Sequence, residues 1–166
     1  MFEPKPISKD AIPSALAKAE RYRLLNEPGE AESICLDVLQ IEPDNQDALV
    51  ALVLALTDQF PQHASPGLAG RAEELIGRVT DPYEREYYAG IIHERRAKAA
   101  LQHDAFHSSA AAAGWLHEAL ACFERAEALK PAHNDDAVLR WNACARMLQK
   151  LAHVVVDTHA EPIESE

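Results

Sequence analysis

Two apolar stripes of helical period, each followed by a proline at the same interval, constrain the fold of this chain most. The first stripe is Ala31, Ile34, Cys35, Val38 and Leu39. The second is Leu116, Ala119, Phe123, Ala126 and Leu129. The first follows the spacing i, i+3, i+4, i+7, i+8, which places its residues on one face of an amphipathic helix, and the second is similar. Ala31 precedes Pro43 by twelve residues, and Ala119 precedes Pro131 by the same interval. The sequence therefore predicts an internal repeat of helices.

The repeat resembles the tetratricopeptide family, in which helix pairs of about 34 residues carry small residues where the helices touch and a proline at the end. Upstream of the first stripe, Ala15, Ala19 and Tyr22 match the family's first helix, and residues 26–29 match its turn. The resemblance implies an all-α protein, a right-handed α-solenoid of helix-turn-helix repeats. About seven helices are expected, as three pairs plus a C-terminal capping helix.

The repeat domain is expected over residues 12–153, after an N-terminal extension at 1–11 and before an acidic, disordered tail at 154–166. Its expected units are 12–45, 46–82, 83–133 and a cap at 134–153. The third unit exceeds one repeat in length, so we expect two long helices with a break near Ser108-Ser109. Asp81-Pro82 and Ser65-Pro66 read as N-caps with a proline at the first helical position. Gly90 stands where the family uses a glycine for close packing.

The formal net charge of −11 disfavours nucleic acid and anionic membrane surfaces as partners. No run approaches the roughly 20 apolar residues that a membrane-spanning helix needs, and no secretory signal is recognisable at the N-terminus. The three cysteines, at positions 35, 122 and 144, lie among alanine and leucine, so we expect buried free thiols. These features predict a cytoplasmic protein.

No residue pattern indicates catalysis or a cofactor. His103 and His107 are four residues apart and would share a helix face, but no third metal ligand of suitable direction accompanies them. The two His-Glu pairs lack the second histidine of a metalloprotease helix, because Ala97 and Ala121 occupy its position. We therefore predict neither an enzyme nor a metal or cofactor site.

By the resemblance, the first helix of each pair lines the concave side of the stack and binds the partner. The inner positions expected there include Leu16, Glu20, Val50, Asp58, Ile91, Asp135 and Val138. The residues predicted to bind the partner are Arg23, Leu54, Tyr87, Tyr88, Arg95, Asn142 and Arg146. Tyrosine and arginine frequently anchor interfaces, although one of the two tyrosines is expected to pack between helices.

The expected function is that of an adaptor or scaffold that holds a peptide or helix of another protein in this groove. Glu20 would repel a terminal carboxylate, which argues against the subclass of these repeats that grips the C-termini of chaperones. The alternative is a self-associating structural subunit that forms a homo-oligomer through an exposed edge of the stack or through the long third pair.

Overall fold

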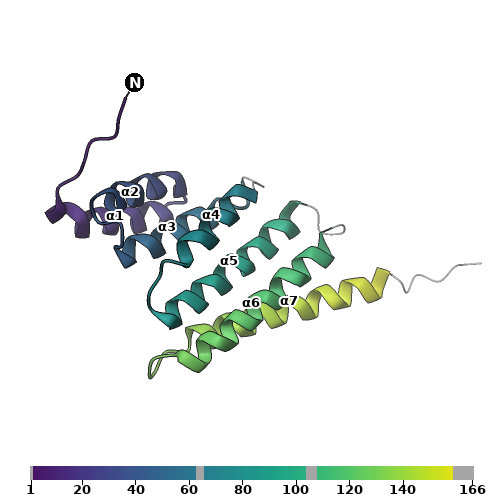
Figure 1. Cartoon of the computed structure of the whole chain (residues 1–166). Helices are drawn as coiled ribbons and strands as arrows, with labels where there is room; N and C mark the ends of the chain where they lie inside the picture. Colours follow the sequence, from purple (N-terminus) through teal and green to yellow (C-terminus); the bar gives the residue numbers. More distant parts are fainter. Residues whose placement is uncertain (1, 63–65, 104–107, 159–166) are drawn as a thin grey trace, which may run out of the picture.

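The computed structural model describes residues 2–62, 66–103 and 108–158. Within these ranges the chain is all-α: a short 3-10 helix at Lys9–Ala11 precedes seven α-helices. They are α1 (Ile12–Leu24), α2 (Pro28–Ile41), α3 (Gln46–Asp58), α4 (Pro66–Ile76), α5 (Pro82–His103), α6 (Ser109–Leu129) and α7 (Asp136–Thr158). The helices follow one another through space in chain order, each packed on the next (Figure 1).

Contacts between alternate helices give the fold an inner layer. Besides its neighbours in the chain, α3 touches both α1 and α5, so these three helices lie side by side. Among the α-helices that are consecutive in the chain, α4 and α5 pack together least extensively. The long helices α5 and α6 form the most extensive pair, and they run alongside each other in Figure 1.

Short polar side chains cap the starts of α3 and α5, the latter at the predicted Asp81. The Asn45 side chain accepts a hydrogen bond from the Ala48 backbone N–H at 2.9 Å, at the start of α3. Asp81 accepts one from the Glu84 N–H at 2.8 Å, at the start of α5. Each bond satisfies one of the N–H groups that a helix start leaves without a backbone partner. Ser65, the cap predicted for α4, lies outside the described residues.

Two apolar clusters form most of the core. The first centres on α3, whose Leu49, Leu52 and Leu56 are fully buried, and the second joins α5, α6 and α7 around Leu116 and Phe123. Tyr88 packs against both clusters. The three cysteines are buried and free, as predicted.

The predicted close packing at Gly90 is confirmed. A Cβ atom added to this residue would lie 2.5 Å from Cε1 of Phe123. Carbon atoms in van der Waals contact lie about 3.5–4.0 Å apart, so no side chain fits between the two helices here without displacing the ring.

The two long helices predicted for the third unit are confirmed, since α5 has 22 residues and α6 has 21. The predicted end of the last helix at residue 153 is five residues too early, because α7 continues through Thr158. Neither glycine nor proline interrupts the chain between Asp136 and Thr158, so the backbone has no local reason to stop. The rest of the predicted tail, 159–166, lies outside the described residues. Among the helices that the structure describes, none is long and apolar enough to cross a membrane.

Candidate functional site

A groove of about 600 Å³ opens on the layer formed by α1, α3 and α5. We call it the inner groove. Its lining residues are Pro13, Leu16, Ala17, Glu20 and Arg23 from α1, Asp47, Val50, Ala51 and Leu54 from α3, and Glu84 and Tyr88 from α5. The floor is apolar, since Leu16, Val50 and Leu54 contribute hydrocarbon side chains. Side chains of these three helices meet because they lie side by side.

Three of the residues predicted to bind a partner line the inner groove: Arg23, Leu54 and Tyr88. They come from three different helices, and the sequence assigned all three to the inner positions of successive helix pairs. The expected inner residues Leu16, Glu20 and Val50 line it as well.

Arg23 and Arg95 are bound within the protein by one carboxylate. Arg23 Nε donates a hydrogen bond to Asp58 Oδ2 at 2.7 Å, and Arg95 Nη1 pairs with Asp58 Oδ1. The exposed fraction of the side chain is 19% for Arg23, 24% for Arg95 and 22% for Asp58. This Arg23–Asp58–Arg95 network ties α1, α3 and α5 together, so it positions the groove.

Further bonds hold Arg95 in place. Its Nη1 also donates to Thr57 Oγ1 at 2.6 Å and to the Leu54 carbonyl oxygen at 3.2 Å. Burial lowers the pKa of the Arg95 guanidinium from its usual value, while the charge of Asp58 acts in the opposite direction. Arg95 lines a separate, smaller cavity of about 180 Å³ together with Asp58 and Lys98.

The two neighbouring tyrosines have different surroundings. Tyr88 lines the inner groove, and burial raises the pKa of its hydroxyl to about 12, so the hydroxyl is protonated at neutral pH. Tyr87 packs among other rings: its centroid lies 5.7 Å from that of Tyr83 and 5.9 Å from that of Phe123. The two rings also contact each other, with centroids 5.1 Å apart, so both tyrosines pack between helices and Tyr88 in addition lines the inner groove.

Three carboxylates stand at the inner groove, and we call Glu20, Asp47 and Glu84 the acidic rim. Among the residues that the structure describes, none of these carboxylates has a hydrogen-bond or ion-pair partner. Burial raises the pKa of Glu84, and the negative charges of Asp81 and Asp47 raise it further. Only Glu20 was singled out from the sequence. Asp47 and Glu84 lie in the first turns of α3 and α5, where acidic residues are common because they complement the helix dipole. The sequence signal that could have identified them is that an acidic residue recurs near the start of two successive inner helices, α3 and α5.

Asn142 and Arg146 lie on α7 and are not among the residues that line the inner groove. Helix α7 packs on α6 and is linked to α5 by an ion pair, in which Arg140 Nη1 lies 3.3 Å from Glu94 Oε1. The Glu94 side chain is 1% exposed and also pairs with Lys98. The structure thus places these two predicted residues on the last helix, beyond the α1–α3–α5 layer.

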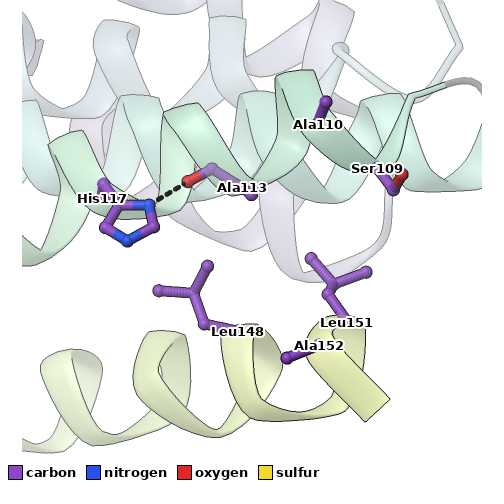
Figure 2. Close-up of a pocket in the computed structure, with 7 residues that line it drawn as sticks. All are labelled: Ser109, Ala110, Ala113, His117, Leu148, Leu151 and Ala152. Carbon is purple, nitrogen blue, oxygen red and sulfur yellow. Dashed lines mark hydrogen bonds between the residues drawn. The ribbon is translucent and has the colours of Figure 1, made fainter. Parts of the chain in front are cut away.

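A second pocket, of about 560 Å³, lies between α6 and α7 (Figure 2). It is lined by Ser109, Ala110, Ala113, His117, Leu148, Leu151 and Ala152. The His117 ring nitrogen Nδ1 lies 2.7 Å from the Ala113 carbonyl oxygen and points along its own helix. The other side chains are mainly hydrocarbon, so this pocket offers apolar surface and little hydrogen bonding. The sequence indicated the long third pair as a possible interface but none of these residues.

Within the described part of the chain, no group of three or more histidine, cysteine or acidic side chains is arranged to hold a metal ion. The His103 and His107 pair falls outside the described side chains. Models of known protein families, curated proteins and solved structures were each compared with the chain, and none of them matches it.

Proposed function

We propose that the protein is an adaptor that holds a peptide or helix of another protein in the inner groove, and that its helices form a short solenoid of the tetratricopeptide kind. The observation that carries the proposal is the joint placement of Leu16, Leu54 and Tyr88. They come from three alternate helices, and the sequence pattern alone assigns each of them to the inner side of its helix pair.

The chemistry of the inner groove suits a polypeptide ligand. An apolar floor gives affinity through burial of hydrocarbon, and polar groups at the margin give orientation. The Arg23–Asp58–Arg95 network fixes the three helices relative to one another, so little ordering is required when a ligand binds. A groove of this size provides a modest interface, and we expect micromolar dissociation constants.

The solenoid assignment rests on packing that recurs along the chain. Helices α1, α3 and α5 lie in one layer, each beside the next. Most members of the two stripes are buried, namely Ala31, Cys35 and Val38 in α2 and Leu116, Ala119, Phe123 and Ala126 in α6, whereas Leu129 at the end of α6 is exposed. The buried, unpaired thiols suit a reducing compartment, which is why we place the adaptor in the cytoplasm.

The test is a pair of matched substitutions at exposed helical alanines. Ala17→Trp fills the inner groove. Ala111→Trp adds the same indole to α6, a helix that contributes no residue to the lining of this groove. Peptides selected on the wild type from a displayed random library should lose at least tenfold in affinity with Ala17→Trp and little with Ala111→Trp. If the selected peptides bind both variants as they bind the wild type, the inner groove is not the binding site.

Self-association is the second candidate function, and the apolar α6–α7 pocket is the observation that favours it. A second copy docked there would give a mass that rises with concentration in analytical ultracentrifugation. Ala152→Arg, at an exposed lining position, should then restore the monomer. A monomeric mass from micromolar to millimolar protein would exclude this function.

A further inference from the structure

The charges of the inner groove are unbalanced, and this imbalance indicates what kind of polypeptide it holds. The lining contains three carboxylates, Glu20, Asp47 and Glu84, and one cation, Arg23. Arg23 is engaged by Asp58 at 2.7 Å. The acidic rim is therefore left without a cation from the described part of the protein.

The surroundings of Glu84, one of the three carboxylates of the acidic rim, disfavour its ionised form. Its pKa is raised first by burial and then by the negative charges of Asp81 and Asp47. Like charges that face one another across a half-buried surface destabilise the ionised form of each. A positive charge arriving between Glu84 and Asp47 would relieve this repulsion, and a negative one would increase it.

The apolar floor sets the second requirement. Leu16, Val50 and Leu54 come from α1 and α3 and present hydrocarbon to the groove. Neighbouring helix axes lie about 8–10 Å apart, so the layer from α1 to α5 spans roughly 16–20 Å. A bound helix would cross that distance with about 11–13 residues, at 1.5 Å per residue. Such a segment has room for about three turns, with apolar residues on one side.

We propose that the occupant of the inner groove is a cationic amphipathic segment of a partner protein. Its apolar side rests on the floor formed by Leu16, Val50 and Leu54. Its lysine or arginine side chains reach the acidic rim. This inference rests on the proposed function and deepens it, because it names the chemistry of the partner.

The experiment uses three synthetic helical peptides of about 14 residues, with the same leucine stripe and with lysine, glutamine or glutamate at the polar positions. Each is titrated calorimetrically into the full chain at low salt. The lysine peptide should bind at least tenfold more tightly than the glutamine peptide, and the glutamate peptide should bind most weakly. Raising the ionic strength from about 0.05 M to 0.5 M should remove most of the difference in affinity between the lysine and glutamine peptides, because salt screens charges at this partly exposed surface.

Two charge-neutralising variants separate the acidic rim from the overall negative charge of the protein. E20Q/D47N/E84Q removes the rim charges, and E74Q/E118Q/E127Q removes three exposed charges outside the groove. Both change the net charge equally. The rim variant should weaken the lysine peptide about tenfold, as expected for three partly exposed ion pairs. The control should change its affinity less than twofold. Circular dichroism checks that both variants remain helical.

The contrary outcomes distinguish the two proposals. If the glutamine peptide binds as tightly as the lysine peptide, and Ala17→Trp blocks both, the groove binds polypeptides but the cationic partner is wrong. Equal losses in the rim variant and in its control would also overturn the inference, because the attraction would then come from net charge. If no peptide binds, the inference fails, and the library selection decides the proposed function separately. If peptides bind but Ala17→Trp has no effect on them, the proposed function and the inference fail together.

Discussion

Replacing Gly90 by alanine tests the closest contact between α5 and α6. The added methyl carbon would lie 2.5 Å from Cε1 of Phe123 and 2.8 Å from Cδ1 and Cζ. These distances are about 1 Å shorter than a normal carbon–carbon contact. The Phe123 side chain is fully buried, and the Tyr87 ring borders it at 5.9 Å between centroids. The phenyl ring is therefore enclosed by the protein and can move only by displacing its neighbours.

Two opposing effects decide the result of Gly90→Ala. Alanine favours a helix over glycine by up to about 1 kcal/mol. Overpacking a filled core costs about 1–3 kcal/mol. We expect overpacking to prevail and the free energy of unfolding to fall by about 1–2 kcal/mol. For a chain of this length that corresponds to a melting temperature about 2–8 °C lower.

Gly114→Ala is the matched control in α6. A Cβ added at Gly114 meets no heavy atom within 4 Å, so only the helix preference acts and stability should rise by about 0.5–1 kcal/mol. Urea unfolding followed by circular dichroism measures both changes. A double-mutant cycle with Phe123→Leu then isolates the contact, because Gly90→Ala should cost at least about 1 kcal/mol less when the ring is absent. If Gly90→Ala stabilises the protein as Gly114→Ala does, the packing argument is refuted.

Three further changes test other parts of the structure. Asp58→Asn leaves two arginines side by side and half-buried, and it should lower the free energy of unfolding by about 1–3 kcal/mol; a loss below about 0.3 kcal/mol in urea titrations would contradict a structural role. Asn45→Ala should cost about 1 kcal/mol in the same assay through loss of the cap on α3. Asn45→Ser keeps an acceptor and should cost less, without placing a second carboxylate beside Glu42, to which Asn45 Nδ2 donates a hydrogen bond at 2.9 Å. Burial raises the pKa of the Cys35 thiol to about 11 and that of Cys144 to about 12, from 9.0. Because the unfolded chain ionises first, stability should be constant below pH 9 and fall as the pH rises towards 11, by roughly 1.4 kcal/mol per pH unit for each thiol. Cys35→Ala should flatten this slope, and an unchanged slope would show that other groups cause it.

Local signals made most helix boundaries predictable. Proline begins α4 and α5 at residues 66 and 82, as the sequence predicts, and Asn45 caps α3 through a bond to a residue three positions away. Each of these signals acts within a few residues of the helix start, so the start can be predicted from the sequence alone. Proline also begins α2 at residue 28, within the segment 26–29 that the sequence pattern assigned to a turn. The end of α7 was mispredicted for the same reason: no local signal terminates the helix, and the change in composition after residue 153 is not a helix stop.

The electrostatic partners of the site could not be predicted in this way. The Arg23–Asp58–Arg95 network joins three helices, and its existence depends on how far each helix is rotated and shifted against the next. Core packing sets those offsets. The sequence therefore identified Arg23 and Arg95 as inner residues, but not that one carboxylate of the protein itself engages both. The position of α7 relative to the inner groove depends on the same offsets accumulated over several pairs, so the sequence could not show that Asn142 and Arg146, which it assigned to the partner site, lie outside the lining of this groove.

The sparse junction between α4 and α5 has a consequence for how the molecule opens. The first apolar cluster belongs mainly to α1–α4 and the second to α5–α7, and Tyr88 is one of the side chains that belong to both. Such an arrangement favours two cooperative units that exchange their amide hydrogens with different free energies of opening. The inner groove crosses the boundary between them, because its lining comes from α1, α3 and α5. A bound segment would contact both units and stabilise their association, adding RT ln(1 + [L]/Kd) to the free energy of separating them. Ligand binding would then be visible as slower amide exchange on both sides of Tyr88, at residues that the ligand never touches.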